Sequence, residues 1–168
     1  ELVKAKSDFN YIGSAAILMN VENGEVLSLV SLPDYDLNQR SSINDNIFAN
    51  KITLGVYELG SVFKTFTIAA GLENKLINSE TVFKNLKNSL TCDKFTINEH
   101  DKLPSSLSAE QILVRSSNIG TVRIAQKLGI EKYKNFLNNL GLLETIKFDL
   151  KEVGTPLSFR WGKCKLAT

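Results

Sequence analysis

The 168-residue sequence predicts a mixed α/β fold of the α+β type, in which a β-hairpin precedes a group of helices. Two apolar segments near the start flank an Asn-Gly pair, which is a strong hairpin signal. Helical periodicity then recurs between residues 61 and 140. A hydrophobic share of 43% and a charged share of 23% are typical of a folded globular domain.

The hairpin is expected to pair residues 14–21 with residues 25–31. Asn23 and Gly24 lie between these segments, and both residue types tolerate the positive φ angles that tight hairpin turns require. Pro33 is expected to end the second strand, because proline has no N–H group to donate to a sheet.

The next segments alternate between polar loops and one apolar helix. Residues 34–50 are polar and predict a loop with a short helix near its end. Residues 61–73 predict a helix that is apolar on nearly all sides and therefore buried, with Ser61 capping its first N–H groups. Residues 75–104 are mixed and predict a loop with a short strand around 94–97.

Further helices are predicted in the second half of the chain. Ser108 and Gln111 form a capping-box pattern, which opens a helix that ends at about Arg115. A helix over 118–128 is expected to end at Gly129, because glycine commonly follows a helix C-terminus.

The last predicted helix covers residues 131–140 and is followed by Gly141. Its apolar face consists of Tyr133, Phe136, Leu137 and Leu140. One two-stranded hairpin is too small to cover so much apolar helical surface. We therefore expect the chain to lack part of its sheet.

Composition excludes several functional classes. The net charge of +2, from 20 basic and 18 acidic residues, and the lack of a basic cluster with interleaved aromatics give no support to nucleic-acid binding. Cys92 and Cys164 match no zinc pattern and are expected to be free or buried thiols. His100, the single histidine, is expected in a solvated loop, so the sequence indicates neither a metal nor a cofactor.

Ser61 and Lys64 are the first candidate catalytic residues. A serine hydroxyl is a poor nucleophile without an adjacent base, and residues at i and i+3 share one face of a helix. Desolvation lowers the pKa of a buried lysine, so Lys64 can take the Ser61 proton. The alternative is a capping serine beside a surface lysine, although Lys64 is the odd residue on an otherwise apolar helix.

Ser116, Ser117 and Asn118 form the second candidate motif, at a junction between two helices. The Ser116 hydroxyl can relay a proton, and the Asn118 amide can hold a substrate amide. The alternative is a linker that caps the next helix. Residues 42–44, Ser-Ile-Asn, also fit a Ser-x-Asn pattern, but they precede Ser61 in a polar loop.

Together these motifs resemble the signature of penicillin-binding proteins and serine β-lactamases. Residues 15–36 resemble the opening of class B transpeptidase domains. Residues 57–64 (Tyr-Glu-Leu-Gly-Ser-Val-Phe-Lys) resemble their nucleophile motif, and residues 109–120 resemble their second motif. The resemblance covers residues 14–168, and the Arg-Ser-Ser-Asn-Ile-Gly form is most similar to the division-specific branch.

The resemblance implies a penicillin-binding protein or serine β-lactamase-like transpeptidase fold and a D,D-transpeptidase of septal peptidoglycan synthesis. Ser61 would attack the D-Ala–D-Ala bond of a stem peptide, with Lys64 as base. Ser116 would shuttle the proton and Asn118 would bind the substrate. A second stem peptide would resolve the acyl-enzyme, penicillin would acylate the same serine, and the Ser61 N–H would supply half of an oxyanion hole.

The sequence departs from the family pattern at two points. Leu59 stands where the family commonly has proline. No Lys-Thr-Gly motif is present, although in the family this motif lies on a later strand of the cleft. Residues 1–168 are therefore expected to be the N-terminal portion of a transpeptidase domain and to be inactive alone.

Two other functions stay open: a serine β-lactamase or β-lactam sensor of the same fold, and a non-catalytic scaffold of the division machinery. By resemblance, the partners are peptidoglycan stem peptides, β-lactams and other cell-division proteins. The expected location is the outer, periplasmic face of the bacterial cytoplasmic membrane, with anchoring by an N-terminal helix outside these residues.

Overall fold

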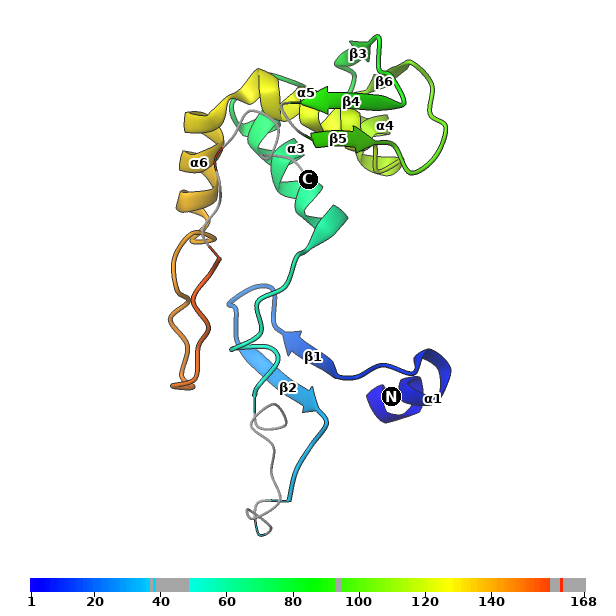
Figure 1. The fold of residues 1–168 in the computed structure, drawn as a ribbon. Coiled ribbons are helices and arrows are strands. Elements are labelled where there is room, and N and C mark those ends of the chain that lie inside the picture. Colours follow the sequence, from blue (N-terminus) through cyan, green and yellow to red (C-terminus); the bar gives the residue numbers. More distant parts are fainter. Residues whose placement is uncertain (37, 39–48, 93–94, 158–160, 162–168) are drawn as a thin grey trace. The chain divides into compact units, whose positions relative to one another are not determined.

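The fold is that of a computed structural model, which describes residues 1–36, 38, 49–92, 95–157 and 161 (Figure 1). The chain divides into two compact units. Unit 1 consists of residues 1–57 and 145–157, and unit 2 consists of residues 58–144 and 158–168. All the candidate site residues belong to unit 2.

Unit 1 is built on the predicted hairpin, which follows helix α1 (Leu2–Phe9). Strands β1 (Ser14–Met19) and β2 (Val26–Leu32) pair antiparallel, and β2 ends directly before Pro33 as predicted. The turn differs in detail from a two-residue turn. Gly24 has a φ of 77°, and a longer connection is held by bonds from the Asn20 N–H to the Glu25 carbonyl and from the Gly24 N–H to the Asn20 carbonyl.

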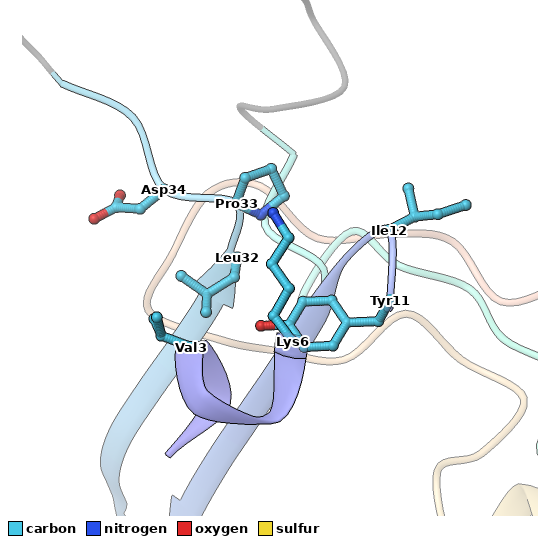
Figure 2. A pocket seen from close by; sticks show the side chains of 7 residues that line it. All are labelled: Val3, Lys6, Tyr11, Ile12, Leu32, Pro33 and Asp34. Carbon is cyan, nitrogen blue, oxygen red and sulfur yellow. The ribbon is translucent and has the colours of Figure 1, made fainter. Parts of the chain in front are cut away.

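Much of the apolar surface of unit 1 is exposed. The large apolar side chains that are exposed on the two strands are Ile17, Leu18, Met19, Leu27 and Val30. A mostly apolar hollow lies at the end of the hairpin opposite its turn, where α1 and the segment after it approach the end of β2 (Figure 2). Its lining residues are Val3, Lys6, Tyr11, Ile12, Leu32, Pro33 and Asp34. The loop predicted over 34–50 lies largely outside the described residues.

The helices of unit 2 follow the predicted order. The helix predicted over 61–73 begins with a 3-10 turn, η2 (Gly60–Phe63), and continues as α3 (Lys64–Glu73). The predicted burial is correct only in part, because η2 has no buried residue and α3 is buried at Lys64, Thr67, Ile68, Ala70 and Gly71. Helix α4 (Ala109–Val114) has the predicted capping box, with 3.1 Å from the Gln111 N–H to the Ser108 hydroxyl and 3.0 Å from the Ser108 N–H to the Gln111 side chain.

The last two helices are α5 (Asn118–Leu128) and α6 (Ile130–Asn139). Helix α5 ends at Gly129, as predicted. On α6, Tyr133 and Leu137 are buried and Phe136 is half-buried, but Leu140 is 50% exposed because the helix has ended at Asn139. The predicted apolar face is therefore correct except at its last member.

Residues 75–104, predicted as a loop with a short strand around 94–97, contain that strand and more strand than expected. Strand β3 (Val82–Lys84) pairs with β6 (Ser106–Ser108), and β4 (Ser89–Cys92) pairs with β5 (Phe95–Asn98). These strands have only three or four residues, too few for a clear alternating pattern. The β3–β6 pair also joins distant segments, which local sequence patterns do not reveal.

Helix α5 is the centre of the unit 2 core. It contributes Ile119 and Ile124 to a cluster with α4 and the strands, and Val122, Ala125 and Leu128 to a cluster with α3 and α6. Figure 1 shows β5 beside α5, and the two elements are in contact. Because α5 is packed from both directions, its first residues are held in fixed positions relative to α3.

Two single-residue predictions have different outcomes. His100 is exposed in a loop, as expected. The prediction of free thiols is wrong for Cys92, which is disulfide-bonded, because sequence spacing gives no information on Cα–Cα distance. Cys164 lies outside the described residues. In the part of the chain that the structure describes, no helix has the length and apolar character needed to span a membrane.

The capping box of α4 leads to a first testable prediction. Ser108→Ala removes the hydroxyl that accepts a hydrogen bond from the Gln111 backbone N–H, and should lower the free energy of unfolding by about 1 kcal/mol. Urea denaturation measures this change. Ser105→Ala is the matched control, because Ser105 is exposed and contributes its backbone carbonyl to Leu86. Equal stability of the two variants would contradict a stabilising cap.

Candidate active site

Lys64 is a buried lysine of unit 2. It occupies the first position of α3, and only 5% of its surface is exposed. Its ammonium donates hydrogen bonds to the Ser116 carbonyl at 2.7 Å, the Ser116 hydroxyl at 2.9 Å and the Asn118 side-chain carbonyl at 2.5 Å. The three donors of the ammonium are therefore matched by three acceptors.

Burial lowers the pKa of Lys64 from its ordinary value of 10.5, and the negative charge of Glu99 opposes this change. Desolvation disfavours the charged form of any group that leaves water. Its three hydrogen-bond acceptors are neutral groups and place no full negative charge against the ammonium. The lysine is thereby brought closer to losing its proton, which a general base must do before it can act.

Ser61 lies within η2, three residues before Lys64. Side chains at i and i+3 of a 3-10 helix eclipse one another, so this turn places both residues on one side. Ser61 is exposed, and no hydrogen bond joins its hydroxyl to Lys64 in the described part of the chain. The predicted capping role of Ser61 is wrong: the N-cap of η2 is Leu59, and no side chain caps it.

The backbone before Ser61 has an unusual conformation. Gly60 has a φ of 58°, in the left-handed region that glycine adopts without a steric penalty. Leu59 has a φ of −74°, within the range that proline would impose. A proline at this position would therefore be compatible with the same angle.

Ser116 lies at the left-handed position that follows α4, with a φ of 53°. The Ser116 N–H bonds to the Leu113 carbonyl at 3.0 Å, and the Ser117 N–H bonds to the Ile112 carbonyl at 2.9 Å. These two bonds define a Schellman motif, whose left-handed residue is usually glycine. A serine there carries backbone strain, and its hydroxyl faces Lys64.

Asn118 is the first residue of α5, and its side chain is held at both ends. Its amide nitrogen donates to the Asn98 carbonyl at 2.7 Å, and its amide oxygen accepts from Lys64. Only the nitrogen can donate to a carbonyl, so these contacts fix the orientation of the amide. Ser117 caps the helix by accepting from the Gly120 N–H at 2.9 Å, so the capping role is confirmed for Ser117, while the site roles of Ser116 and Asn118 stay a prediction.

Glu99 is the residue that sequence reasoning missed. It follows β5 and is half-buried. Its carboxylate accepts from the Ser117 hydroxyl at 2.6 Å, the Asn118 N–H at 2.8 Å and the Ile119 N–H at 3.0 Å. No local signal marks Glu99, because its partners lie 18 to 20 positions later in the sequence.

The structure brings Lys64, Ser116 and Asn118 into direct contact and places Ser61 one short helical turn away from Lys64. The alternative Ser-x-Asn pattern at 42–44 lies outside the described residues. Among the described residues, no group of three His, Cys, Asp or Glu side chains could hold a metal ion. An exposed hydroxyl, a lysine of lowered pKa and a second hydroxyl suit acyl transfer through a serine nucleophile.

The strain at Ser116 gives a second testable prediction. Ser116→Gly and Ser116→Ala both remove the hydroxyl, but only alanine keeps a side chain at the left-handed angle. The glycine variant should therefore be the more stable of the two by about 1 kcal/mol in urea denaturation.

The same pair of substitutions at Arg115 is the control. Arg115 has a φ of −89°, where glycine gains nothing from its freedom. Arg115→Ala should therefore be at least as stable as Arg115→Gly. The same order of stability at both positions would contradict strain at Ser116.

Comparisons with known proteins show the family of the chain. Residues 14–165 match the family described as "Penicillin binding protein transpeptidase domain". The chain is 32% identical, over its whole length, to the "Probable peptidoglycan D,D-transpeptidase FtsI" of Caulobacter vibrioides, of which it spans 28%.

Two solved structures have a closely similar fold. One is titled a peptidoglycan glycosyltransferase from Burkholderia ambifaria (TM-score 0.83, 25% identity), and the chain covers 99% of its own length and 49% of that chain. The other is the transpeptidase domain of Burkholderia pseudomallei penicillin-binding protein 3 (TM-score 0.82, 25% identity, 99% and 46% coverage). The chain belongs to the family of penicillin-binding protein transpeptidase domains.

Proposed function

We propose that the protein is a peptidoglycan D,D-transpeptidase that cross-links stem peptides through an acyl-serine intermediate and is acylated by penicillin. The main observation that supports this proposal is the buried Lys64 ammonium, which contacts Ser116 and Asn118 and lies one helical turn after the exposed Ser61. Family membership and the curated relative named as a D,D-transpeptidase support the same reaction.

In the first half of the reaction, Ser61 Oγ attacks the carbonyl carbon between the two terminal D-Ala residues. Lys64 takes the hydroxyl proton in its neutral form, and its lowered pKa makes that form more populated. The tetrahedral intermediate then expels the terminal D-Ala, whose amine needs a proton. In the proposed mechanism the Ser116 hydroxyl relays that proton, which its 2.9 Å contact with the Lys64 ammonium supports.

In the second half, the amine of another stem peptide attacks the acyl-enzyme ester. The amine gives up one proton to neutral Lys64 through the Ser116 hydroxyl as the new amide bond forms, and Ser61 leaves with the proton that Lys64 returns. The negative charge on the carbonyl oxygen in each half needs N–H donors. Since η2 begins at Gly60, the Ser61 amide is among the first N–H groups of the turn, which have no partner within a helix.

The chain spans about half the length of the solved structures it matches and about a quarter of the curated relative. We infer that it is the N-terminal portion of a transpeptidase domain, and that later strands supply the Lys-Thr-Gly motif and cover the exposed apolar side chains of β1 and β2. The relative's name supports peptidoglycan cross-linking. From the resemblance of residues 115–120 (Arg-Ser-Ser-Asn-Ile-Gly) to the division-specific branch, we further propose a role in septal wall synthesis, at the periplasmic face of the membrane and with other division proteins as partners.

Covalent labelling tests the nucleophile. In the full-length protein, Ser61→Ala should abolish labelling by a fluorescent penicillin, because the attacking oxygen is lost. Ser106→Ala, which changes an exposed serine on β6, should label like the wild type. Wild-type labelling of Ser61→Ala would overturn the proposal.

The lifetime of the label separates the proposal from its nearest alternative. A transpeptidase should hold the penicilloyl group for many minutes, whereas a serine β-lactamase would release penicilloate within seconds. Release can be followed by the loss of gel fluorescence after excess unlabelled penicillin is added. Rapid turnover would favour a hydrolase of the same fold.

The protonation of Lys64 gives a pH prediction. Only neutral Lys64 can accept the Ser61 proton, so the acylation rate should rise with pH and level off above the pKa of Lys64. Burial lowers that pKa, so the midpoint should lie below 10.5. Stopped-flow acylation between pH 6 and 10.5 measures it. Lys64→Arg should lose most of the rate, because a guanidinium stays protonated, and a wild-type profile in this variant would contradict Lys64 as the base.

A further inference from the structure

We propose that Glu99 is a positioning residue of the acyl-transfer site, which holds the start of α5 and, through Asn118, the ammonium of Lys64. This inference rests on the proposed function, because it concerns the same reaction. Its basis is that one carboxylate binds three donors on three consecutive residues, Ser117, Asn118 and Ile119.

Glu99 and its neighbour Asn98 hold Asn118 from two directions. Glu99 Oε2 accepts from the Asn118 backbone N–H at 2.8 Å, and the Asn98 carbonyl accepts from the Asn118 side-chain amide at 2.7 Å. The backbone position and the side-chain rotation of Asn118 are thereby both set by the end of β5. Its remaining polar atom, Oδ1, is then directed at Lys64.

Helix capping alone does not account for this arrangement. Ser117 already caps α5, and its own hydroxyl proton goes to Glu99 Oε1 at 2.6 Å. The partial positive charge of the helix N-terminus stabilises the carboxylate in return. A cap formed within α5 would stabilise the helix in any position. The contacts with Glu99 instead attach the start of α5 to the end of β5, where Asn98 and Glu99 orient Asn118.

The charge of Glu99 also affects the pKa of Lys64. Burial lowers the pKa of Lys64, and Glu99 raises it by favouring the ammonium. The other charged side chains on α3 and on the elements packed against it are exposed: Glu73, Glu110, Arg115, Arg123, Lys127, Glu131, Lys132 and Lys134. Buried Tyr133 shares a hydrogen bond with Thr67. Loss of the Glu99 charge should therefore leave the lowering by burial unopposed.

The test is Glu99→Gln in the full-length protein, read by stopped-flow acylation with a fluorescent penicillin across pH and by urea denaturation. The amide cannot accept from all three donors, so Asn118 should shift and the plateau rate should fall on the order of 10- to 100-fold. The midpoint of the pH profile should move to lower pH, because the negative charge is gone. Asp101→Asn, which neutralises an exposed carboxylate on the same loop, should change neither quantity.

Glu99→Asp separates the effect of the negative charge from the effect of side-chain length. It keeps the charge on a shorter side chain, so the pH midpoint should stay near that of the wild type while the plateau rate falls. This variant also carries the test if Glu99→Gln does not fold. A wild-type plateau in Glu99→Asp, or lower stability of Glu99→Gln with an unchanged rate and midpoint, would overturn the inference. If the Glu99 variants gave either of those results and Ser61→Ala still lost penicillin labelling, only the inference about Glu99 would fail and the proposed function would stand.

Discussion

The burial of the Lys64 ammonium is the constraint on which the rest of the site depends. A charge removed from water destabilises a fold unless hydrogen bonds satisfy it. Here the acceptors come from Ser116 and Asn118, more than 50 positions later in the chain. The first turn of α3 and the turn between α4 and α5 must therefore stay together, and the packing of α5 against both core clusters fixes that distance.

The same constraint explains why an unfavourable backbone angle is kept at Ser116. Glycine would suit the Schellman motif better, but glycine has no hydroxyl for Lys64. Strain of this kind persists only where the surroundings determine the conformation. Three features determine the conformation here. They are the cap of α4, the two hydrogen bonds that close the Schellman motif, and the hydrogen bonds of Glu99 to the residues after Ser116.

Local signals predicted much of the fold and part of the site. The Ser108–Gln111 box, the stop at Gly129 and the three-residue spacing of Ser61 and Lys64 each involve neighbours in sequence, and the structure has the helices that they indicate. Features that depend on distant partners were missed. The β3–β6 pair, the bond of Cys92 and the contacts of Glu99 with α5 leave no periodic or spacing pattern. The left-handed angle of Ser116 was missed because serine rarely adopts it.

The pKa of Lys64 is subject to two opposing effects, and their balance suits the proposed reaction, in which Lys64 takes and returns a proton. Burial favours the neutral form, which can accept the proton of Ser61. The charge of Glu99 favours the ammonium, which is the form that exists once that proton has been accepted. With burial alone, Lys64 would hold the transferred proton weakly, and with a directly bound carboxylate it would rarely be neutral. Glu99 instead makes its hydrogen bonds to Ser117, Asn118 and Ile119, so its charge reaches the ammonium without direct pairing and leaves Lys64 able to exist in either form.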